Sequence, residues 1–157
     1  MSTTYASNTD VSSSRSREEI EKTLMRYGAT DFAYGWNETR ALLGFVINGR
    51  QVRFVLPMPD RKSSEFTLTP AKRFRRTPEE AAKAYEQAVK AKWRSLFLVI
   101  KAKLEAVSAQ IVTFEQEFGM HMVLPDGQTV AEYVVPMVAQ AYAEGKVPPM
   151  LALTAAD

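Results

Sequence analysis

The 157-residue chain contains no cysteine and only one histidine. Without cysteine, disulfide bonds and thiolate metal sites are excluded, which fits a reducing compartment. The chain also lacks an apolar run of the roughly 18 residues that span a bilayer, and its first residues lack the apolar core of a secretion signal. We therefore predict that the protein does not associate with a membrane.

Patterns that support catalysis are scarce as well. The histidine, His121, is flanked by Met120 and Met122, and a lone histidine in apolar surroundings is more often structural than catalytic. The sequence has no glycine-rich phosphate loop, no set of histidines and carboxylates at metal-ligand spacing, and no nucleophile elbow. We predict that the protein is not an enzyme and uses no metal or cofactor.

Glycine and proline are missing from residues 79–118. A helix start is predicted by three residues: Thr77 as N-cap, Pro78 at the first helical position and Glu80 in a capping box. Gly119 predicts the end of the helix. Apolar residues recur between them at steps of three and four, at Tyr85, Val89, Trp93, Leu96, Ile100, Leu104, Val107, Ile111, Phe114 and Phe118. This pattern predicts one long helix of roughly 60 Å.

A helix of that length carries more apolar surface than one small domain covers, which predicts self-association into a homo-oligomer. Within it, residues 96–100 are five apolar residues in succession, and we expect them to be buried on all sides.

The chain before this helix predicts a short helix and a meander. Residues 1–15, rich in Ser, Thr and Asn, predict a disordered N-terminus, and residues 16–153 predict a single domain. A capping box that starts at Ser16 predicts a helix over 17–27. Alternating aromatic residues at 32–36 predict a first strand.

Residues 41–47 and 50–58 predict two further strands, joined by Asn48-Gly49, which is typical of a two-residue hairpin turn. That turn places Ile47 opposite Arg50 and Phe45 opposite Val52, on an apolar face that we expect to meet the long helix. The other face is half apolar and half basic, with the pairs Val46–Gln51, Gly44–Arg53 and Leu42–Val55 and with Arg40 beyond.

After Gly119, residues 121–124 predict a short strand and 130–144 a final helix, with Pro136 either kinking it or marking its first turn. The segment 147–153 predicts an extended tail with apolar anchors. The predicted fold class is α+β: a short N-terminal helix, a three-stranded antiparallel meander, one long helix, a short C-terminal helix and a tail.

Charge is divided unevenly along the chain. Residues 1–104 carry a net charge of +8, and residues 105–157 carry −6. A loop predicted at 59–77 concentrates positive charge, and four more basic residues form one row on the long helix, about 110° from its apolar stripe. The candidate nucleic-acid-binding residues are Arg40, Arg53, Arg61, Lys62, Lys72, Arg73, Phe74, Arg75, Arg76, Lys83, Lys90, Arg94 and Lys101.

Cationic side chains with interleaved aromatic residues are typical of surfaces that bind single-stranded nucleic acid, where phosphates supply affinity and bases stack without a sequence code. Helix-turn-helix, zinc-finger and ribonucleoprotein motifs are absent from the sequence. For a charge row alone, a solvated face that only confers solubility is the commoner explanation.

Five short segments are distinctive: Tyr27-Gly28-Ala29, Phe32-x-Tyr34-Gly35-Trp36, Leu56-Pro57-Met58-Pro59, Lys92-x-Arg94 with 100–107, and 123–130. Together they resemble a family of small proteins encoded by actinobacterial phages and prophages. The resemblance covers residues 15–153 and implies a phage protein in the cytoplasm of a bacterial host cell. The layout of meander and long basic helix also resembles the core of phage single-strand annealing proteins.

Two functional hypotheses follow. The first is a non-catalytic protein that binds or anneals single-stranded DNA in phage recombination or replication. The alternative is a protein-binding module, either an inhibitor of a host factor or a small assembly or virion component, whose interface is the long helix and the tail at 147–153. Under both, we expect a homo-oligomer.

Overall fold

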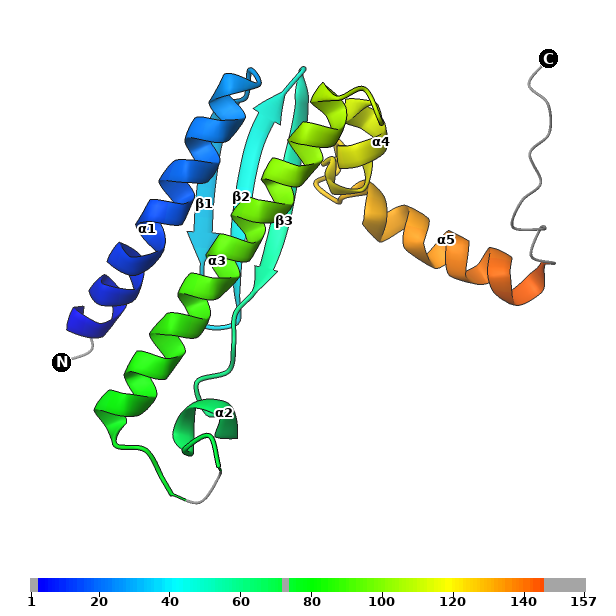
Figure 1. Ribbon diagram of the computed structural model, residues 1–157. Coiled ribbons are helices and arrows are strands. Elements are labelled where there is room, and N and C mark those ends of the chain that lie inside the picture. Colours follow the sequence, from blue (N-terminus) through cyan, green and yellow to red (C-terminus); the bar gives the residue numbers. More distant parts are fainter. Residues whose placement is uncertain (1–2, 72–73, 146–157) are drawn as a thin grey trace, which may run out of the picture.

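The computed structural model describes residues 3–71 and 74–145, with side chains from Ser14 onward. It confirms the predicted α+β class (Figure 1). Two helices lie side by side on one face of a three-stranded antiparallel sheet, and a further helix extends away from these two layers (Figure 1). The elements are α1 (Thr3–Arg26), β1 (Thr30–Trp36), β2 (Arg40–Ile47), β3 (Arg50–Pro57), α2 (Ser64–Thr67), α3 (Pro78–Ser108), α4 (Phe114–Phe118), the 3₁₀ turn η1 (Gly119–His121) and α5 (Val130–Glu144).

The hairpin β2–β3 has the predicted register. Ile47 pairs with Arg50, and Phe45 pairs with Val52. The turn residues Asn48 and Gly49 both have positive φ, 52° and 69°, as a turn matching the twist of the strands requires. The side chains on one face of the hairpin are buried, which confirms that this face meets the helix layer.

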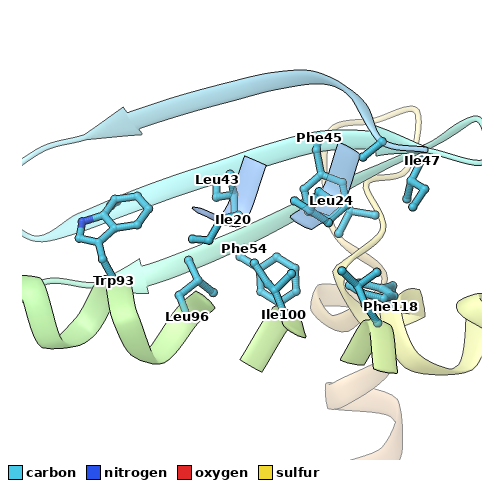
Figure 2. Close-up of a cluster of buried hydrophobic side chains, with 14 of the residues drawn as sticks. Ile20, Leu24, Leu43, Phe45, Ile47, Phe54, Trp93, Leu96, Ile100 and Phe118 are labelled. Carbon is cyan, nitrogen blue, oxygen red and sulfur yellow. The ribbon is translucent and has the colours of Figure 1, made fainter. Parts of the chain in front are cut away.

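The core lies between the sheet and the two helices (Figure 2). Side chains from α1, from the inner face of the sheet, from α3 and from α4 meet there. The largest fully buried side chains are those of Ile20, Leu24, Leu43, Phe45, Val52, Ile100, Leu104 and Phe118.

Helix α1 is longer than predicted. It begins at Thr3, inside the segment 1–15 for which we predicted disorder, so the predicted start near residue 17 is wrong. No glycine or proline precedes Gly28, and once a helix has formed around the packed Ile20 and Leu24, each added residue gains one hydrogen bond. The capping-box pattern at Ser16 therefore lies within the helix.

Helix α3 is shorter than predicted. Its start is as predicted, with Thr77 and Glu80 forming the capping box, but it ends at Ser108. The chain turns there because Gln110 adopts a left-handed conformation (φ 61°). The N–H groups of Gln110 and Ile111 bond back to the carbonyls of Val107 and Ala106, the hydrogen-bond pattern of a Schellman helix end.

The turn sends α4 back over the end of the sheet. Thr113 caps α4 in a capping box with Gln116, and Lys103 Nζ reaches Glu117 Oε1 at 3.0 Å. Phe118 returns to the core, edge-on to Phe45 with ring centroids 6.4 Å apart.

Two predictions about the long helix are wrong. At 1.5 Å per residue α3 is about 46 Å long, not 60 Å, and Ile111 on the predicted apolar stripe is 76% exposed. The segment 96–100 is not buried on all sides, because Leu98 and Val99 face solvent, 51% and 46% exposed. The length of the helix therefore no longer argues for self-association.

The segment before α5 attaches to the edge of β3. Only isolated bridges form there, Val52 with Met122 and Val123 with Thr129, where we predicted a strand at 121–124. Helix α5 has the predicted bounds and runs through Pro136. The predicted tail at 147–153 lies outside the described residues.

Candidate binding surfaces

The predicted basic residues of the sheet lie on the face opposite the helices. Arg40 and Arg53 alternate with the buried residues of β2 and β3, so both belong to the outer face. Arg53 Nη2 donates to the carbonyl of Gly127 at 3.0 Å and lies 3.8 Å from a carboxylate oxygen of Glu132. Arg53 therefore anchors the segment that leads into α5.

The predicted basic loop contains ordered structure. Helix α2 lies within it, and Phe66 is buried edge-on against Tyr85, so Phe66 is a core residue. The Arg61 guanidinium lies over the Tyr85 ring, 4.2 Å from its centroid, and Lys62 is exposed. Arg76 borders an open groove of about 600 Å³ between α2 and α3.

Of the four remaining candidate residues in the loop, the structure describes two. Arg75 is exposed and forms a bridge with Leu68, and Phe74 is 71% exposed. Lys72 and Arg73 lie outside the described residues.

The row of four basic residues on α3 is exposed, as the prediction of a binding surface requires. Lys83, Lys90, Arg94 and Lys101 are all exposed on α3, and none forms an ion pair within the described part of the chain. At 1.5 Å per residue the row is about 27 Å long.

The predicted nucleic-acid-binding residues do not all lie on one surface of the protein. Helix α3 lies on the inner face of the sheet (Figure 1), so the arginines of the outer face point away from the layer that carries the row. Arg61 contacts α3 through Tyr85, about 160° from the row, whereas Arg76 borders a groove whose α3 lining includes Gln87, about 40° from the row. A single cationic groove built from all three elements is therefore not formed.

His121 has a structural environment. Its ring stacks on that of Phe54, with centroids 4.2 Å apart. Burial, and then the nearby Lys103, lower the pKa of His121 below its usual 6.5. Among the residues that the structure describes, no group of three His, Cys, Asp or Glu side chains is placed to hold a metal ion.

Sequence reasoning missed the most unusual surface, which is helix α5. It has no buried residue, although its composition is apolar. Its exposed large side chains are Tyr133, Val135, Met137, Val138 and Tyr142. Figure 1 shows α5 extending away from the sheet and the other helices. A helix that is apolar over most of its surface normally packs against other protein.

The base of α5 is nevertheless held firmly. The carboxylate of Glu132 accepts a hydrogen bond from the N–H of Thr129 at 2.6 Å, and the Tyr133 hydroxyl donates to Asp126. The N–H of Val130 donates to the carbonyl of Met122 at 3.0 Å. These bonds fix the direction in which the helix leaves the body.

The outer face of the sheet is a second uncovered surface. A Cβ added at Gly35 would meet nothing within 4 Å, and one at Gly44 would meet only atoms of the neighbouring strands. By strand alternation the face consists of Ala33, Gly35, Leu42, Gly44, Val46, Val55 and Pro57, with the polar residues Thr30, Arg40, Gln51 and Arg53. An antiparallel sheet with one solvated face normally alternates apolar and polar residues. On the open face of this sheet four of these eleven residues are polar, so apolar residues and glycine make up the larger part.

No protein-family model, no curated protein and no solved structure matches this chain. The resemblance to phage proteins therefore stays a prediction. Of the helices within the described residues, none is both long enough and apolar enough to span a membrane.

Proposed function

We propose that the chain is a non-catalytic protein-binding module and that α5 is its binding element. The observation that carries this proposal is the exposure of Met137 and Tyr142, 66% and 65%, on a helix with no buried residue. A 15-residue helix that is held only at its base is marginal in water, so a partner that buries its apolar side chains supplies the missing stabilisation.

The attachment of α5 to the rest of the protein supports this role. A hydrogen bond from the Thr129 N–H to Glu132 caps the start of the helix, and Arg53 joins the preceding segment to the sheet. A helix presented in a fixed direction loses less conformational freedom on binding than a flexible segment does, which favours affinity.

Photo-crosslinking tests the proposal. A benzophenone amino acid replaces Met137 in the full chain, which is expressed in a bacterial cell and irradiated. Ile111 is the matched control position, because it is also apolar and exposed but lies on the turn after α3. We expect a discrete protein adduct from position 137 and none from position 111. The absence of an adduct from position 137, or equal adducts from both positions, contradicts the proposal.

Binding of single-stranded nucleic acid is the second candidate function, and one observation favours it. The row Lys83, Lys90, Arg94 and Lys101 leaves four positive charges exposed along one side of α3. If each neutralises one phosphate of a single strand, the logarithm of the binding constant falls with the logarithm of salt concentration at a slope of about −2.8.

Fluorescence anisotropy with a labelled oligonucleotide measures this slope. Replacing Lys90 and Arg94 by Ala should halve it to about −1.4, since two of four phosphate contacts are lost. The matched control replaces Arg40 and Gln51, on the opposite face, and leaves the slope unchanged. Binding that is absent at low salt, or that is as sensitive to the control as to the row, excludes this function.

A further inference from the structure

The groove between α2 and α3 opens beside the row of four basic residues on α3. The two surfaces meet at Gln87, which lines the groove and lies about 40° around the helix from the row. Residues three and four apart are neighbours on a helix surface, so Lys83 and Lys90 both flank Gln87. A ligand that contacts these two lysines therefore lies at the mouth of the groove.

The lining of the groove is largely apolar. Phe66 and Pro70 line it from α2 and the loop that follows, and Ala84 and Ala88 line it from α3. Because alanine has no side-chain atoms beyond Cβ, α3 leaves space here that a larger side chain would fill. The volume of about 600 Å³ is within the range of about 300–1,000 Å³ that is usual for small-molecule sites.

Three polar side-chain groups border the same groove. They are the guanidinium of Arg76, the amide of Gln87 and the carboxylate of Glu65. Within the described residues, none of these groups forms an ion pair or a side-chain hydrogen bond. The guanidinium donates, the carboxylate accepts, and the amide does both. A flat ring with donors and acceptors on its edge, such as a nucleobase, matches this combination.

Charge indicates which part of a nucleotide enters the groove. Arg76 and Glu65 carry opposite charges at the groove, so it has no excess of positive charge to hold a phosphate. The row beside it carries four positive charges, none of them in an ion pair within the described part of the chain. Phosphates are therefore favoured on the row, and the uncharged base is favoured in the groove.

We propose that the groove binds one base of a single strand whose phosphates lie along the row. This inference rests on nucleic-acid binding, the second candidate function, and adds to it a site for a base. Single strands are favoured over duplexes, because a paired base must first leave the stack to enter such a site.

A base bound in the groove should strengthen binding without changing its dependence on salt. Contact between one base and a protein site commonly contributes about a factor of ten in affinity. We therefore expect a strand with bases to bind about tenfold tighter than a backbone of the same length and charge that lacks bases.

Fluorescence anisotropy with two labelled probes tests the inference. One probe is a twelve-nucleotide thymidine strand, and the other is a deoxyribose-phosphate backbone of the same length without bases. Ala84→Leu and, independently, Ala88→Leu extend a side chain into the groove. Ala102→Leu is the matched control, because Ala102 lies about five turns from Ala84 on the same side of α3, outside the groove. Circular dichroism checks that each variant is folded.

The wild-type chain and Ala102→Leu should both bind the thymidine strand about tenfold tighter than the base-free backbone. Ala84→Leu and Ala88→Leu should bind both probes equally, with the affinity that the wild-type chain has for the base-free backbone. The salt slope should stay at about −2.8 in all four proteins, because the phosphate contacts are unchanged.

The outcomes separate this inference from the function on which it rests. Equal binding of the two probes by the wild-type chain overturns the inference and leaves nucleic-acid binding standing. A preference for the thymidine strand that survives in both Ala84→Leu and Ala88→Leu also overturns it, because the base then binds elsewhere. If neither probe binds at low salt, nucleic-acid binding and the inference are both overturned.

Discussion

Removal of the Phe118 side chain tests the turn that sends α4 back to the core. Phe118 is fully buried, edge-on to Phe45 and Phe54 and stacked on Phe114 with centroids 5.0 Å apart. A buried phenylalanine replaced by alanine loses about 3–5 kcal/mol of unfolding free energy. That is a large part of the roughly 5–15 kcal/mol available to a whole domain.

Ile111→Ala is the informative comparison, because Ile111 and Phe118 belong to the same apolar stripe in the sequence. Ile111 is 76% exposed. Full burial of an isoleucine contributes about 1.5–3 kcal/mol, and only about a quarter of this side chain is buried. We therefore expect Ile111→Ala to lower the unfolding free energy by about 0.5 kcal/mol.

Urea unfolding followed by circular dichroism measures both losses, with the protein concentration held constant. For a urea slope of about 2 kcal/mol per M, Phe118→Ala lowers the midpoint by about 1.5–2.5 M and Ile111→Ala by about 0.3 M. A helix continuing straight to Gly119 would place both residues on one stripe. Equal midpoint shifts would therefore refute the turn.

Three further predictions concern single groups. Thr113→Ala removes the cap of α4 and should lower the unfolding free energy by about 1 kcal/mol in the same urea assay, whereas an unchanged value would argue against that helix start. The pKa of His121 is lowered in the folded state, so the unfolded state binds more protons below pH 6.5. The stability that His121 contributes is thus present above pH 6.5 and lost as pH falls. His121→Phe should therefore make the urea midpoint less sensitive to acid. An unaltered dependence of the midpoint on pH would contradict this. Burial, and then Glu21, raise the pKa of Tyr34 to about 12, so one tyrosine should form phenolate well above pH 10, and Glu21→Gln should lower that midpoint. This contribution to stability is present below pH 10 and lost as pH rises toward 12, and a phenolate titration in which every tyrosine ionises near pH 10 would contradict it.

The parts of the fold that short-range chemistry determines could be predicted from the sequence. Asn48-Gly49 permits one tight turn, and that turn sets the pairing of every residue in β2 and β3. Thr77 and Glu80 likewise determine the start of α3.

The end of α3 could not be predicted from glycine, because Gln110 occupies the left-handed position where glycine is usual. One signal was nevertheless present. Thr113 and Gln116 have the spacing of a capping box, which indicates a new helix start before Phe118.

The candidate site depended on tertiary structure. Arg53 and Arg94 are both basic and exposed or partly exposed, but the sequence does not tell which layer of the fold each occupies. The exposure of α5 is also a tertiary property, because the pattern at 130–144 is equally compatible with a helix packed on its own domain. The bonds at Thr129 and Val130, which direct this helix away from the core, form only in the folded protein.

The identity of the peptide crosslinked to position 137 tests the central claim most directly. Proteolysis and mass spectrometry of the adduct locate the partner residue. The account predicts one discrete partner peptide joined to position 137 and no adduct at the control position 111. A chain that forms no adduct at this position, at any concentration at which it is folded, would contradict the claim that α5 is a binding helix.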